Sequence, residues 1–248
     1  MALILVLWIV AALAIFASSL GGVVRQEAAV GGVTRQLAQG RALGEAAIYQ
    51  VLQRMAVKPA DFREFSVVPV SLGGAVVEVD IIPWSGLVNI NGASSTLLSA
   101  LLTQVAGLGQ GPAEVLAQAI VQARTGDGQR RVLRPAWESP EDLLQVPGMT
   151  YDIYSRLRDF VVADVSARSS INPAAAPAQL QPWLERADGV AAFRQTTISS
   201  RYSLVAKVPF GGGSGVRLVR QVDVQGGTAN RRLPWVIFSA SQAWVGRM

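Results

Sequence analysis

The sequence predicts an α+β fold: a long N-terminal helix packed on an antiparallel sheet, with a large helical segment inserted between two strands. Three observations predict this arrangement. Helical periodicity runs over the first 55 residues, β-rich runs lie at residues 66–82 and 200–224, and the 248-residue chain is helical between them. When strands flank a helical block in this way, one sheet carrying an insertion is the simplest compact arrangement.

Residues 1–20 are apolar and carry no charge. A helix of 20 residues is about 30 Å long, which matches the apolar thickness of a bilayer. We therefore expect residues 1–20 to form the transmembrane half of the N-terminal helix. Two other interpretations stay open. One is a plain single-span anchor, and the other is a secretory signal peptide, although the charged region that begins such a peptide is missing.

Residues 21–55 continue the same helix as an amphipathic half, for a total length of roughly 80 Å. Apolar or small residues recur there every three or four positions, at Val33, Leu37, Gly44, Ile48, Val51 and Met55. We expect Val33, Leu37, Ile48 and Val51 to face the sheet or the helices of neighbouring subunits. Two glycine pairs, at residues 21–22 and 31–32, mark either kinks or places where glycine is tolerated.

The rest of the chain divides into a β domain and an insert. The sequence predicts two hairpins and a further strand. The first hairpin covers residues 66–70 and 75–82, the second covers residues 200–209 and 216–224, and the strand covers the apolar residues 233–244. We assign residues 56–88 and 190–248 to the β domain. Residues 89–189 form the inserted α-helical domain, with helices expected over residues 96–105, 112–124 and 151–162 and near Trp183.

Composition argues against an enzyme. The net charge is +5, and the chain contains no Cys and no His. This excludes disulfides, Cys/His zinc sites, a Cys nucleophile and a His general base. We therefore expect a non-enzymatic protein without a cofactor.

Two segments of the insert, residues 101–109 and 143–150, resemble helix-hairpin-helix units, whose glycine turns bind phosphate with the help of a nearby cation. The first keeps Gly107 and Gly109 but is followed by no cation, and the second has Thr150 in place of its last glycine. We do not expect nucleic acid as a partner, although a membrane-anchored helix-hairpin-helix DNA-binding protein stays open as an alternative.

Six carboxylates of the insert could bind metal, but their spacing fits no EF-hand loop. They are Asp127, Glu138, Glu141, Asp142, Asp152 and Asp159. Helix capping and solvation account for most of them, and a calcium site formed across loops stays open.

With these residues identified, the chain closely resembles the class K minor pseudopilins of type II secretion systems (general secretion pathway protein K) over nearly its whole length. The most specific match is SPEDLLQVPGMTYDIYSR at residues 139–156, followed by SINPAAAP at residues 170–177. SGLVNIN at residues 85–91 resembles the entry into the family's helical insert. MALILVL at residues 1–7 resembles its mature N-terminus.

The resemblance implies a pilin-like fold and a non-enzymatic role at the tip of a secretion pseudopilus, nucleating or capping assembly for protein export. The implied partners are minor pseudopilins of classes I and J, with class H as a further candidate, the major pseudopilin, the inner-membrane assembly platform and prepilin peptidase. The implied location is the bacterial inner membrane, with a single pass and a periplasmic head. A minor pilin of a type IV pilus or DNA-uptake filament stays open.

Two residues at the N-terminus carry specific expectations from the resemblance. Met1 is either the translation start or the N-methylated residue left after a short basic leader is removed. Leu5 stands where most pilin-like subunits carry Glu, whose charge pairs with the N-terminal amine of the subunit nearer the tip. A subunit with nothing above it has no such amine to meet, and leucine avoids the cost of a carboxylate in lipid.

Overall fold

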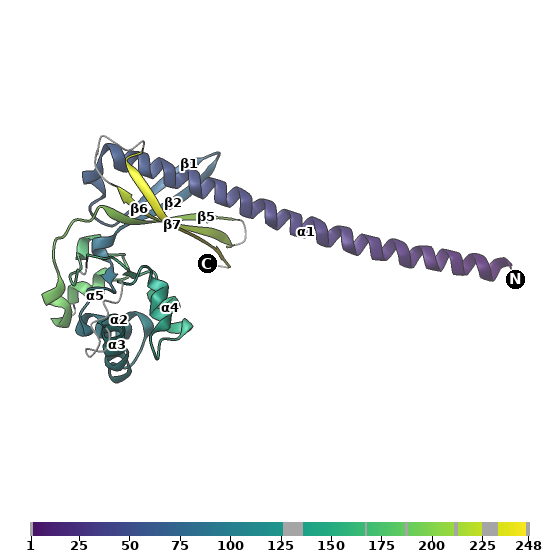
Figure 1. Cartoon of the computed structure of the whole chain (residues 1–248). Coiled ribbons are helices and arrows are strands. Elements are labelled where there is room, and N and C mark those ends of the chain that lie inside the picture. The colour runs from purple at the N-terminus through teal and green to yellow at the C-terminus, as the bar shows by residue number, and fades with distance from the viewer. Residues whose placement is uncertain are drawn as a thin grey trace.

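The computed structural model describes residues 2–125, 136–166, 168–186, 188–210, 213–224 and 233–246. Its longest element is helix α1 (Ala2–Val57), which projects far beyond the rest of the molecule (Figure 1). The helix continues through both glycine pairs, so glycine is tolerated there rather than breaking the helix. A short 3-10 turn, η1 (Pro59–Phe62), follows it.

Five antiparallel strands form the sheet. They are β1 (Ser66–Leu72), β2 (Ala75–Pro83), β5 (Arg201–Pro209), β6 (Gly215–Val224) and β7 (Trp235–Val245), in the order β1-β2-β5-β6-β7. Gly73 and Gly74 both have positive φ in the β1–β2 turn, as a tight hairpin requires. The predicted α+β class is confirmed, and the apolar tail does form the last strand.

The core between α1 and the sheet consists of alternate residues of each strand. Tyr202, Leu204, Ala206 and Val208 of β5 face α1, as their alternation predicts. From the helix, Ile48, Val51, Leu52 and Met55 complete this cluster. No described residue between 84 and 200 belongs to this cluster, so the packing of helix on sheet does not involve the described part of the insert.

The insert follows β2 and returns to β5, its immediate neighbour in the sheet, and its helices lie on the side of the sheet away from α1 (Figure 1). Its elements are η2 (Trp84–Gly86), β3 (Val88–Asn89), α2 (Ser95–Ala106), α3 (Gln110–Thr125), η3 (Pro140–Gln145), α4 (Tyr151–Leu157), β4 (Val161–Val162), η4 (Pro173–Ala175), α5 (Gln181–Arg186) and η5 (Asp188–Phe193).

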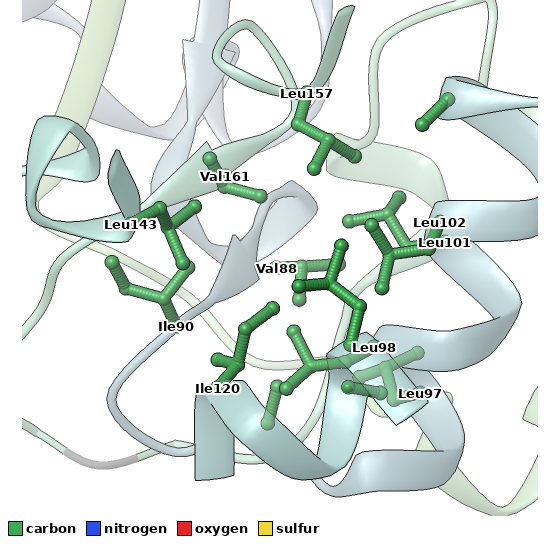
Figure 2. Close-up of a cluster of buried hydrophobic side chains, with 14 of the residues drawn as sticks. Val88, Ile90, Leu97, Leu98, Leu101, Leu102, Ile120, Leu143, Leu157 and Val161 are labelled. Atoms are coloured by element: carbon green, nitrogen blue, oxygen red, sulfur yellow. The ribbon is translucent and has the colours of Figure 1, made fainter. Parts of the chain in front are cut away.

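A second hydrophobic core lies within the insert. Leu97, Leu98, Leu101 and Leu102 of α2 meet Ile120 of α3 there, and residues from α4 and the two short strands close the cluster (Figure 2). Ser94 and Thr150 cap α2 and α4 by accepting the backbone N–H groups of Leu97 and Ile153.

The predicted helix over residues 151–162 is too long. Helix α4 ends at Leu157, and Val161–Val162 instead form strand β4, which pairs in parallel with Val88–Asn89. Both valines are buried, and β-branched side chains favour a buried strand over a helix end. Local periodicity could not predict this strand, because its partner lies 73 residues earlier in the chain.

Removing the insert should leave the sheet intact. Pro83 and Tyr202 are paired across β2 and β5, so an Asn-Gly turn in place of residues 84–201 would convert the two strands into a hairpin. Ile82 and Val205 would be changed to Thr, because the insert covers them. We expect the far-UV circular dichroism of this variant in detergent to keep its β contribution, since the core under α1 is unchanged. Loss of the β signal would mean that the two cores fold only together.

Candidate functional site

One face of α1 approaches the sheet so closely that a Cβ atom at either of two glycine positions would force neighbouring side chains to shift. A Cβ atom on Gly44 would lie 2.6 Å from Cδ1 of Leu218, and one on Gly40 would overlap the ring of Phe210. Ile48 and Val51 continue the same face and are fully buried against the sheet. The predicted stripe therefore packs α1 on its own sheet from Gly40 to the end of the helix.

The same stripe continues beyond the sheet without cover. Val33 and Leu37 lie on the face of Gly40 and Gly44, yet 49% and 39% of their surfaces are exposed. The structure thus separates the four predicted stripe residues into a buried pair, Ile48 and Val51, and an exposed pair. We call residues 33 and 37 the free stripe, and its role in assembly stays a prediction.

A buried ion pair joins α1 to the sheet. Arg220 of β6 is 5% exposed and donates to the Glu45 carboxylate of α1 and to the carbonyl oxygens of Val219, at 2.8 Å, and Ser241, at 3.0 Å. A buried guanidinium is tolerated when its donors are satisfied in this way. Arg220 alternates with Leu218 and Val222 along β6 and is buried with them, but local alternation cannot identify its partner Glu45, which lies 175 residues earlier.

Little of the structure describes the two N-terminal residues, Met1 and Leu5, for which we predict a role. Met1 is outside the described residues, and Leu5 is described only as part of the α1 backbone. Among the residues that the structure describes, no helix combines the length and apolar character needed to cross a membrane. The side chains of residues 12–30 lie outside the described part, and the span over residues 1–20 stays a prediction.

The motif residues 85–91 and 170–177 hold the insert together. Asn89 exchanges two hydrogen bonds of 3.0 Å with the backbone of Asp164, and Asn91 bonds to both backbone groups of Trp137 at 2.8 and 3.0 Å. A Cβ on Gly86 would overlap the backbone of Ala175. These residues therefore join segments that are distant in sequence, and their contacts are structural.

The two helix-hairpin-helix-like units pack against each other. Their glycines Gly107 and Gly148 have positive φ. Arg156 of the second unit donates to the carbonyl oxygen of Ala106 at 3.0 Å, which caps the end of α2, and forms an ion pair with Asp152. A cation beside the first turn is thus engaged within the insert, while the expectation that the protein binds no nucleic acid stays a prediction.

Several of the six carboxylates have protein partners. Asp142 accepts the backbone N–H groups of Glu138 and Ser139, and Asp159 forms an ion pair with Arg217 at 3.0 Å. Asp127 lies outside the described residues. Within the described ranges, no group of three or more acidic residues is arranged to hold a metal ion, and the calcium alternative stays untested.

Glu141 and Tyr154 form a hydrogen-bonded pair where the insert meets the sheet. Burial alone would raise the pKa of the Glu141 carboxyl, but hydrogen bonds from Ser139, its own backbone N–H and Tyr154, with the charge of Arg158, lower it overall. Burial and the hydrogen bond to Glu141 raise the pKa of the Tyr154 hydroxyl. Glu141 is thus held ionised and Tyr154 protonated.

The insert is fixed to the sheet by an arginine that bridges both. Arg201 of β5 forms ion pairs with Asp164 of the insert at 3.2 Å and with Asp223 of β6 at 3.7 Å. Its guanidinium also lies 5.5 Å from the ring centroid of Trp84, and Trp84 donates to Ser203 at 3.1 Å. These contacts give the insert one defined position on the sheet.

Comparison with known proteins identifies the fold. No protein-family model and no curated protein sequence matches the chain. Among solved structures, the chain is similar to one in the crystal structure of the GspK-GspI-GspJ complex of the type 2 secretion system from enterotoxigenic Escherichia coli. The TM-score is 0.52 at 12% identity, and the match covers 85% of this chain and 98% of that one. The pilin-like fold predicted from the sequence is therefore present.

The glycine stripe gives a matched pair of substitutions. Gly44→Ala should lower the free energy of unfolding by about 1–3 kcal/mol, because the added methyl crowds the buried Leu218 side chain. A Cβ on Gly32 would meet nothing within 4 Å, so Gly32→Ala should be neutral or stabilise the helix by up to about 1 kcal/mol. Urea denaturation in detergent would measure both, and equal effects would contradict close packing at Gly44.

Proposed function

We propose that this protein is a structural subunit, a minor pseudopilin, of a type II secretion pseudopilus. The observation that carries the proposal is the free stripe on α1, which continues the sheet-packing face of the helix beyond the sheet. A helix that projects from its domain with an uncovered apolar stripe is suited to pack against other helices. The fold is shared with a chain of a complex of three secretion proteins, which supports the same role.

The proposal places α1 in a helical bundle with the N-terminal helices of neighbouring subunits. Residues 1–20 would hold the subunit in the bacterial inner membrane before assembly, with the head in the periplasm. Met1 would be the N-methylated residue left by prepilin peptidase. The neighbours would be minor pseudopilins of classes I and J, with the major pseudopilin below them.

We further propose that this subunit lies at the tip of the pseudopilus. The insert adds a second body to the head, on the side of the sheet away from α1 (Figure 1). This bulk and Leu5 both favour a subunit with no other above it. The function would be mechanical, because the chain lacks the His and Cys side chains of common catalytic sites, and several of its described arginines and carboxylates are engaged in structural contacts.

Substitutions on the two halves of the stripe should separate assembly from folding. Leu37→Asp should change the free energy of unfolding by less than about 0.5 kcal/mol, because residue 37 is 39% exposed, yet it should abolish copurification with co-expressed minor pseudopilins. Ile48→Asp should instead unfold the head, since it buries an unpaired charge under the sheet. Gln39→Asp, which lies on the opposite face, is the control. Unchanged copurification of Leu37→Asp would contradict the assembly role of the free stripe.

Leu5→Glu tests the tip position. In a tip subunit the new carboxylate would meet no amine, and a charge near the bilayer centre costs about 2.5 kcal/mol or more. We expect filament assembly and secretion to fall in a strain that lacks the native protein. An internal subunit would respond oppositely, because its neighbour's N-terminus would neutralise the charge. Improved assembly with Leu5→Glu, or labelled copies distributed along the filament, would contradict the tip position.

A further inference from the structure

The last strand of the sheet has an edge that no other described strand covers. Strand β7 pairs with β6 on one side, and it ends the sheet order on the other. A bulge at Phe238 interrupts its register, but residues 239–245 pair regularly with β6. We call residues 239–245 the open edge. Its free backbone donors and acceptors could pair with another extended chain.

The open edge lacks the features that keep edge strands from pairing. Strand β7 has no charged residue and no proline, and Trp244 is 45% exposed. The opposite edge strand, β1, is shorter and carries Pro69 at its centre, which removes a backbone donor. The two edges of one sheet therefore differ, and β1 is blunted in the way expected of an edge that stays in water.

A cleft of about 410 Å³ runs along the open edge, on the face of the sheet that carries the insert. Ser239 and Ser241 line it from β7, and Glu138 and Glu141 line it from the insert. Its ionisable walls hold three carboxylates, including that of Asp159, and two guanidiniums, so negative charge is in excess. Asp159 is paired with Arg217, while no salt bridge within the described residues reaches Glu138.

We propose that the open edge binds an extended segment of a co-assembling subunit, which adds a sixth strand beside β7 and places a Lys or Arg side chain in the cleft. Main-chain hydrogen bonds along residues 239–245 would supply affinity, and the carboxylates would select the cationic side chain. A second copy of this chain fits less well, because each copy carries a net charge of +5. This inference rests on the proposed function, since it requires neighbouring subunits.

The test uses the full chain co-expressed with minor pseudopilins of classes I and J and purified from membranes. Ser239→Lys combined with Ser241→Lys puts two cations on exposed positions of the open edge, where they oppose strand pairing and neutralise the cleft. Val67→Lys is the matched control on β1, where Val67 is 46% exposed. We expect the double variant to reduce copurification at least tenfold and the control to leave it within twofold.

Cross-linking identifies the occupant. Because the chain has no cysteine, Ser241→Cys and Val67→Cys each supply one thiol for a thiol-to-amine linker. We expect Ser241→Cys to capture a lysine in an extended segment of a co-assembling subunit and Val67→Cys to capture none.

The remaining outcomes distinguish a failure of the open-edge inference from a failure of the proposed function. If the wild type copurifies with the other subunits and the double lysine variant does so to within twofold, the open-edge inference is overturned. The proposed function is unaffected by that result. Capture of a second copy of this chain alone would also overturn the open-edge inference. Failure of the wild type to copurify with either subunit class would count against the proposed function, and the open-edge inference would fall with it.

Discussion

The close approach of α1 to the sheet governs the rest of the structure. At Gly40 and Gly44 the helix lies so close to the side chains of Phe210 and Leu218 that an added methyl group would force them to shift, and the buried pair of Glu45 with Arg220 joins the two elements beside that contact. Glycine at these positions lets the helix sit directly on the strands, and α1 packs on the sheet from Gly40 onward. The helix projects beyond the sheet with the free stripe, residues 33 and 37, exposed, and the proposed role in a filament depends on that projection.

The separation into two cores follows from the same contact. Since α1 occupies one face of the sheet, the insert packs on the other, and the strands β2 and β5 that flank it remain neighbours. Arg201 and Trp84 then fix the insert to the sheet through charges and ring contacts, and a small buried cluster of Ile82, Trp84, Leu87, Val162 and Val205 packs between the two. The helix and the insert can therefore serve different partners, because neither contributes to the core of the other.

The local sequence pattern predicted most of the helices and strands, but it could not predict pairing between residues distant in the chain. The turn glycines, the caps at Ser94 and Thr150 and the strand alternation act within a few residues, so the long helix, both hairpins and the insert could be predicted. Strand β4 was mistaken for helix because its partner is remote. For the candidate site, the spacing of the stripe identified its face, but it could not show where the sheet ends. The division between buried Ile48 and exposed Leu37 thus required the structure.

The proposed role requires that α1 is the helix of a filament subunit matured by the pilin machinery. Mass spectrometry of the N-terminus of the protein purified from its native membrane tests this most directly. We expect a chain that begins at an N-methylated Met1. An unmethylated N-terminus, or a leader still attached in the assembled protein, would contradict it.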